Sequence, residues 1–169
     1  NNTQLLNGIQ LYKIYPENDR TKTANKLNNG VWADFYNSAF LTDSTGVQIY
    51  HKSKLVAGVE TIPFRDIVEP LLGNVMLNFG GTVLTRATQK ERETFPLYND
   101  VKISPVICYE SVYGEFVTGY VRNGAEVLAI MTNDAWWGDT AGHKQHMAYA
   151  NLRAIETRRA VVRSANTGI

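Results

Sequence analysis

Residues 101–132, VKISPVICYESVYGEFVTGYVRNGAEVLAIMT, form the stretch that decides the fold. Val101–Cys108 is mostly apolar and predicts a strand, and Glu115–Arg122 predicts a short helix that Asn123-Gly124 closes. Val127–Thr132 is a continuous apolar run with β-branched ends, which is typical of a strand covered on both faces. The order strand, helix, strand predicts an α/β sheet with helices packed on it.

The same alternation continues towards the end of the chain. His143–Arg159 predicts the clearest helix of the sequence, and Ala160–Ala165 predicts a further strand. This helix is amphipathic, and its apolar residues gather on one side: Met147, Ala148, Leu152 and Ile155. Polar residues follow the predicted strand ends at positions 108, 132 and 166, and sites in such folds lie at strand ends.

The first hundred residues contain weaker patterns. Tyr36–Thr42 and Val47–Tyr50 predict a β-hairpin with a glycine in its turn, whereas the polar stretch Pro16–Gly30 predicts a long loop. Pro63–Leu72 fits one or two turns of helix. Because neither an internal repeat nor an interdomain linker is evident, we expect residues 1–169 to be part of a single domain.

Composition excludes some functions. The 17 Lys and Arg residues and the 16 Asp and Glu residues leave a net charge of +1 and are spread along the chain, which argues against a nucleic-acid partner. No apolar run approaches the roughly 18 residues that a membrane-spanning helix needs, so we expect the chain itself to be soluble. The sequence lacks an initial Met and stops directly after a strand-like run, so we expect it to be a piece of a longer protein.

Cys108 is the only cysteine, and it stands where an apolar strand gives way to the start of a helix. A helix N-terminus favours the thiolate, which is the nucleophilic form of the side chain. Buried cysteines also serve simply as small apolar residues, and the strand pattern alone favours that alternative.

Lys52 and Lys54 follow the second strand of the predicted hairpin. If the extended backbone continues, their side chains share one face of the chain, and one of them points inward. An inward ammonium group costs several kcal/mol unless it is paired, so such a lysine would be functional. The alternative is a solvated basic turn.

Three carboxylates are candidates for supporting acids: Glu60, Glu110 and Glu115. Each also fits an ordinary surface position. His143 and His146 have a spacing that suits metal ligands, but no third ligand accompanies them, so we expect no metal. Trp136 and Trp137 fit either an apolar lip for a substrate or the closure of a sheet edge.

Three segments in a fixed order resemble the nitrilase (carbon-nitrogen hydrolase) superfamily: YHKSKLVAGVE (50–60), VICYE (106–110) and NDAWWGD (133–139). The LVAGVE extension, the CYE box and the WWGD loop are similar to the apolipoprotein N-acyltransferase branch of that superfamily. The resemblance runs from about residue 36 to residue 169. It implies an α/β fold of the nitrilase type, an α-β-β-α sandwich that is incomplete at both ends of this chain.

The superfamily uses a Glu-Lys-Cys triad. The resemblance places the nucleophile at Cys108 and the lysine that stabilises the oxyanion at Lys52. Glu60 and Glu110 match positions that support catalysis in the family, and Tyr109 is expected to pack beside the thiol.

The triad glutamate is expected upstream of residue 1, because Pro16-Glu17 matches the motif by only two letters and lies in a polar loop. The resemblance implies transfer of a fatty acyl chain from a phospholipid to the N-terminal S-diacylglyceryl-cysteine of apolipoproteins, through a thioester on Cys108. It implies no cofactor. The alternatives are a soluble amidase of the same superfamily, or an inactive fragment of either enzyme.

The same resemblance implies where the parent protein works and what it contacts. The partners are a phospholipid acyl donor and a diacylglyceryl-lipoprotein acceptor. The membrane is reached through segments outside this chain, and the catalytic domain faces the periplasm at the bacterial inner membrane. We expect the isolated chain to be inactive.

Overall fold

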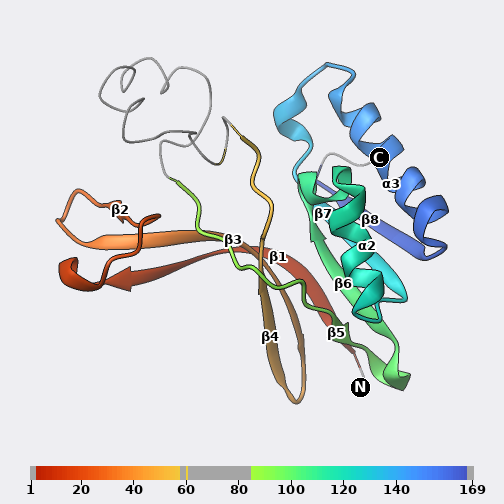
Figure 1. Cartoon of the computed structure of the whole chain (residues 1–169), viewed down its shortest axis with the longest axis horizontal. Helices are drawn as coiled ribbons and strands as arrows, with labels where there is room; N and C mark the ends of the chain where they lie inside the picture. The colour runs from red at the N-terminus through yellow and green to blue at the C-terminus, as the bar shows by residue number, and fades with distance from the viewer. Residues whose placement is uncertain (1–2, 58–59, 61–84, 167–169) are drawn as a thin grey trace. The chain divides into compact units, whose positions relative to one another are not determined.

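The computed structural model describes residues 3–57, 60 and 85–166 (Figure 1). The predicted α/β class is confirmed. The strands are β1 (Leu5–Tyr15), β2 (Asn25–Lys26), β3 (Trp32–Asp43), β4 (Gly46–His51), β5 (Phe95–Pro96), β6 (Lys102–Ile107), β7 (Val127–Thr132) and β8 (Ala160–Ala165). The helices are α2 (Gly114–Arg122) and α3 (Gly142–Thr157), with 3-10 segments η1 (Glu17–Asp19), η3 (Tyr98–Asp100), η4 (Cys108–Val112) and η5 (Ala135–Trp137). The helical turns predicted for Pro63–Leu72 lie outside the described residues.

The strands form two four-stranded sheets. In the first sheet β3 pairs with β1, β2 and β4, and its antiparallel pairing with β4 is the predicted hairpin. The second sheet has the order β5-β6-β7-β8 (Figure 1). The predicted loop at Pro16–Gly30 contains η1 and the two-residue strand β2.

The described residues divide into two compact units. Unit 1 contains residues 3–9, 38–53 and 89–166, and it includes the whole second sheet with α2 and α3. Unit 2 contains residues 10–37, 54–57, 60 and 85–88.

Strands β6, β7 and β8 run parallel, and their register decides where their ends lie. Ile107 of β6 pairs with Met131 of β7, and Thr132 of β7 pairs with Ala165 of β8. Because parallel strands finish at one edge of a sheet, the residues that follow these three strands gather at that edge. Cys108 is the first of them.

The core of unit 1 joins the β3–β4 hairpin, the second sheet and α2. The Tyr50 and Tyr120 rings meet edge to face with centroids 6.0 Å apart, and Phe116 packs edge to face on Tyr120. The buried apolar residues of the core are Ala39, Leu41, Tyr50, Phe95, Ile103, Val106, Ile107, Phe116, Val117, Tyr120, Ala125, Leu128, Ala129, Ile130 and Ala150.

The apolar side predicted for α3 is not the side that the helix buries. Leu152 is 46% exposed and Ile155 is 77% exposed. The residues that α3 buries are His146, Ala150 and Arg153. The two polar members of this set make hydrogen bonds to the backbone carbonyl oxygens of Cys108 and Val112, so polar contacts orient the helix.

Candidate active site

Cys108 is the first residue of η4 and lies at a sharp turn directly after β6. Its backbone φ is 51°, a left-handed conformation that residues other than glycine rarely adopt. Its side chain is half-buried, and its carbonyl oxygen accepts a hydrogen bond of 2.9 Å from Ser111 Oγ. The predicted helix Glu115–Arg122 is confirmed as α2, which begins at Gly114. The residues directly after the thiol belong to a 3-10 segment, so the N-terminus of α2 does not lie beside Cys108 in the sequence.

Glu110 is a fully buried carboxylate that accepts hydrogen bonds both from the segment after β4 and from the end of β6. Its Oε1 accepts hydrogen bonds from Tyr50 Oη at 2.8 Å and from the Ser53 backbone N–H at 2.7 Å. Its Oε2 accepts a hydrogen bond of 2.9 Å from the Ile107 backbone N–H. Burial and the Glu110 charge raise the pKa of the Tyr50 phenol far above its usual range, so this hydroxyl remains a donor. Glu110 therefore holds the segment after β4 against the turn at Cys108.

Lys52 lies inside the segment that Glu110 holds. The Lys52 side chain is only 1% exposed, whereas Lys54 is exposed. The two lysines do not share one face, because β4 ends at His51 and the extended geometry does not continue to Lys54. The structure thus buries the lysine that the resemblance assigns to catalysis.

The supporting residues predicted from the sequence lie in different places. Tyr109 is half-buried, and its ring lies edge to face with Tyr113 at a centroid distance of 6.2 Å. Glu60 belongs to unit 2, where its carboxylate accepts hydrogen bonds from the Asn37 side chain and from the Val56 backbone N–H.

Trp137 is half-buried and packs on Gly142, the first residue of α3, so closely that a Cβ atom at position 142 would overlap the indole ring. The side chain of Trp136 is outside the described part of the structure.

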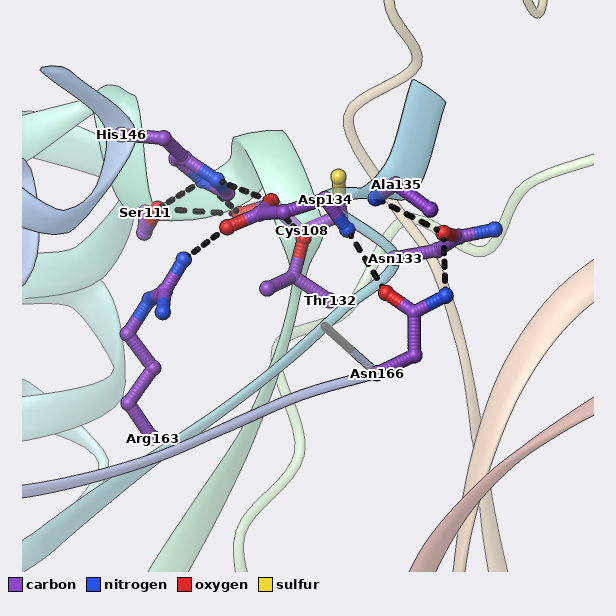
Figure 2. Close-up of polar contacts among 9 residues, drawn as sticks. All are labelled: Cys108, Ser111, Thr132, Asn133, Asp134, Ala135, His146, Arg163 and Asn166. Carbon is purple, nitrogen blue, oxygen red and sulfur yellow. Dashed lines mark hydrogen bonds and ion pairs between the residues drawn. The ribbon is translucent and has the colours of Figure 1, made fainter. Parts of the chain in front are cut away.

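A second polar network lies at the same sheet edge, as Figure 2 shows. His146 Nδ1 lies 3.0 Å from Asp134 Oδ1, and Arg163 forms an ion pair with the other oxygen of that carboxylate. His146 Nε2 lies 3.0 Å from Ser111 Oγ and 3.1 Å from the carbonyl oxygen of Cys108. The network therefore connects β8 and the end of β7, through α3, to the turn at Cys108.

Asp134 is held in its charged form. Burial would raise the pKa of this carboxyl, but hydrogen bonds from His146 and Thr132 and the charges of His146 and Arg163 outweigh burial and lower the pKa. The Thr132 hydroxyl donates to Asp134 Oδ1 at 2.8 Å, and the Asp134 backbone N–H donates to Asn166 Oδ1 at 3.1 Å.

Sequence patterns do not reveal this second network. The spacing of the histidines presents His146 only as a candidate metal ligand, and Asp134 and Arg163 stand out only as parts of longer segments. The available signal is the position of Asp134 directly after an apolar strand, at the edge where the next strand also ends.

Comparison with known proteins places the chain in the family that the three sequence segments resemble. A sequence model of the carbon-nitrogen hydrolase family matches residues 12–169. The apolipoprotein N-acyltransferase of Chlorobaculum tepidum is 34% identical over 99% of this chain and 32% of that protein. The apolipoprotein N-acyltransferase of Rhizobium meliloti is 38% identical over 80% of this chain and 25% of that protein. The chain spans about a third or less of the length of these relatives.

Solved structures with a similar fold include Saccharomyces cerevisiae Nit3, a member of the nitrilase superfamily. It has a TM-score of 0.52 and 15% sequence identity, over 78% of this chain and 39% of that chain. A mutant of the Nesterenkonia AN1 amidase, from the same superfamily, has a TM-score of 0.52 and 15% identity, over 79% of this chain and 41% of that chain. At these identities the likeness shows the nitrilase fold alone.

Replacing Glu110 with Gln tests its role as the anchor. Tyr50, Ser53 and Ile107 all donate to the carboxylate, so the amide NH2 group must face a donor and a buried hydrogen bond is lost. We expect the free energy of unfolding to fall by about 1–3 kcal/mol, measured by denaturant unfolding. The control is Glu115→Gln at an exposed position of α2, where a change within about 0.5 kcal/mol is expected. Equal effects of the two substitutions would contradict the anchor.

The lowered pKa of Asp134 predicts a pH dependence of stability. Because the folded pKa lies below the unfolded value of about 3.9, the carboxylate stabilises the fold above that pH, and this contribution is lost as acid protonates it. We expect Asp134→Asn to be less stable than the wild type at pH 7, with the difference shrinking between about pH 5 and pH 2.

The measurement is the free energy of unfolding at several pH values, with exposed Asp139→Asn as the control. Hydrogen bonds from Thr45 and Gln4 lower the pKa of Asp43 to about 2. Asp43 is present in every variant, so its contribution cancels in the difference. A difference that stays constant with pH would rule out the charge of Asp134 as the source.

Proposed function

Because the chain belongs to the carbon-nitrogen hydrolase family, we propose that it supplies the nucleophile and the oxyanion lysine of an acyltransferase. The reaction moves a fatty acyl chain from a phospholipid to the N-terminal S-diacylglyceryl-cysteine of a bacterial lipoprotein. Support for this substrate class comes from relatives named apolipoprotein N-acyltransferase, which are 34% to 38% identical over most of the chain.

The observation that carries the proposal is the shared carboxylate of Glu110. One of its oxygens binds the backbone next to Lys52, and the other binds the backbone next to Cys108. An acyl-transfer site needs a nucleophile and a cation at fixed relative positions, because the cation must meet the charge that develops on the attacked carbonyl oxygen. A single buried group that fixes both segments meets this requirement.

The first half of the reaction forms a thioester. The thiol of Cys108 gives its proton to a base, which the Glu-Lys-Cys triad of the family supplies as a carboxylate, and the sulfur attacks the ester carbonyl carbon of the phospholipid. The ammonium group of Lys52 stabilises the oxyanion of the tetrahedral intermediate. The ester C–O bond then breaks, and the lysophospholipid leaves with the proton that the base returns.

The second half of the reaction releases the acyl chain. The α-amine of the lipoprotein cysteine attacks the thioester carbon, an amide bond forms, and the C–S bond breaks to regenerate the Cys108 thiol. The alternative is that water takes the place of the amine, which would make the protein an amidase or another hydrolase of the same family. The names of the relatives favour the amine.

The membrane is the natural location for this chemistry, because both proposed substrates carry acyl chains. Among the described residues, no helix is long and apolar enough to cross a membrane. We propose that the protein works at the periplasmic face of the inner membrane. We propose that two aromatic residues, Trp137 and Tyr109, border the site that holds the acyl chain.

Replacing Cys108 with Ser tests the nucleophile. The full-length protein is incubated with a phospholipid labelled in its ester-linked acyl chain, and acyl-enzyme is located by peptide mass spectrometry. We expect label on Cys108 in the wild type, released by hydroxylamine, and none at position 108 in the variant. Adding a diacylglyceryl peptide should move the label to its amine. Release as free fatty acid, with or without the peptide, would support the hydrolase.

Replacing Lys52 with Ala tests the oxyanion lysine. We expect the rate of acyl-enzyme formation to fall by about 100-fold or more, because the charge that stabilises the transition state is removed. The control is Lys54→Ala, two residues away and exposed, for which we expect a change of less than about threefold. If Lys54→Ala is the damaging substitution, the assignment of the lysine is wrong by two residues.

A further inference from the structure

Both ring nitrogens of His146 face hydrogen-bond acceptors. Nδ1 lies 3.0 Å from a carboxylate oxygen of Asp134, and that carboxylate is held in its charged form. Nε2 lies 3.1 Å from the carbonyl oxygen of Cys108, which can only accept. The Ser111 hydroxyl, 3.0 Å from Nε2, already lies within 2.9 Å of the same carbonyl oxygen and donates to it.

These contacts bear on which nitrogens of the ring donate hydrogen bonds. A neutral ring that donates from Nδ1 would present a lone pair on Nε2 to the lone pairs of the Cys108 carbonyl oxygen. The single hydroxyl proton of Ser111 would then be needed by Nε2 and by that carbonyl oxygen at once. A ring protonated on both nitrogens satisfies every group in the network. Figure 2 shows the contacts of the ring, with the sulfur of Cys108 outside the hydrogen bonds drawn.

We propose that His146 is a positioning residue for Cys108: as an imidazolium held by Asp134, it donates a hydrogen bond to the Cys108 carbonyl oxygen and fixes the left-handed backbone of that residue. The inference rests on the proposed function of Cys108 as the nucleophile. It assigns to His146 a role in the reaction without contact between the ring and the substrate.

The groups packed around His146 come from the loop after β7, from η4 and, through a shared carboxylate, from β8. The groups that face it are the Asp134 carboxylate from the loop after β7, and the Ser111 hydroxyl, the Cys108 carbonyl and the Tyr109 ring from η4. Arg163 of β8 reaches the same carboxylate. With the ring in its charged form, the three charges sum to one positive charge beside the turn that carries the thiol, and a nearby positive charge is a general feature of reactive cysteines.

The left-handed backbone explains why the turn needs such a support. A φ of 51° is unfavourable for a residue with a Cβ atom, so the turn persists only if its surroundings hold it. The Cys108 carbonyl accepts two hydrogen bonds, from His146 and Ser111, at the peptide whose orientation sets the turn. Charge-assisted bonds of this kind are stronger than neutral ones.

The test is the alkylation of Cys108 in the full-length protein by iodoacetamide, followed from about pH 5 to pH 9 by peptide mass spectrometry. In His146→Gln, which keeps a polar side chain but removes the charge, we expect about tenfold slower alkylation at pH 7 and a half-maximal rate at higher pH. In the matched control His143→Gln, three residues earlier on α3, we expect the wild-type profile.

A second measurement uses the wild-type protein, in case His146→Gln does not fold. Nitrogen NMR of ring-labelled histidine, assigned by comparison with His143→Gln, reports whether both ring nitrogens of His146 carry protons at pH 7. The proposal expects two protonated nitrogens. A bare nitrogen in that spectrum, or an unchanged alkylation profile in folded His146→Gln, would overturn it.

Failure of this inference differs from failure of the proposed function. If the wild type forms no acyl-Cys108 but His146→Gln still slows alkylation, the transferase proposal fails and the positioning role stands. If acyl-Cys108 forms and His146→Gln alkylates normally, the transferase proposal stands and the role of His146 falls. A merely structural histidine would lower thermal stability without moving the pH profile.

Discussion

The buried carboxylate of Glu110 is the interaction on which the rest of the site depends. A buried charge is tolerated only when hydrogen bonds replace its lost hydration, and Glu110 accepts them from Tyr50, Ser53 and Ile107. These donors come from β4 and the segment after it and from the end of β6, which are separated by more than fifty residues of sequence. The energetic requirement of one charge therefore brings the Lys52 segment and the Cys108 turn together, and it does so independently of the Lys52 and Cys108 side chains themselves.

A second constraint comes from the parallel register of β6, β7 and β8. This register places the turn at Cys108, the loop at Asp134 and the end of β8 along one edge. Three polar groups that are distant in the sequence then close a buried network through His146. In α3 the polar residues His146 and Arg153 are buried together with Ala150, whereas Leu152 and Ile155 lie on its surface.

The sequence is most informative where the pattern is local. Strands β7 and β8 begin and end at the predicted residues, and β7 is a continuous apolar run bounded by turns. Local pattern fails for α3, since amphipathicity assumes that the buried side is the apolar one. It also cannot separate Lys52 from Lys54, because the answer depends on where β4 ends. The contacts of Asp134 are beyond prediction, since they exist only once three strands are in register.

The left-handed backbone at Cys108 limits which chemistry this fold can host. A branched Cβ atom is poorly tolerated at such a φ, so threonine is a strained occupant of the turn, whereas serine fits the same space. The backbone of this position thereby favours side chains that are not branched at Cβ. Under this constraint, a change of reaction at this site involves the surrounding acids, bases and pocket-lining residues, while position 108 keeps a small side chain that is unbranched at Cβ.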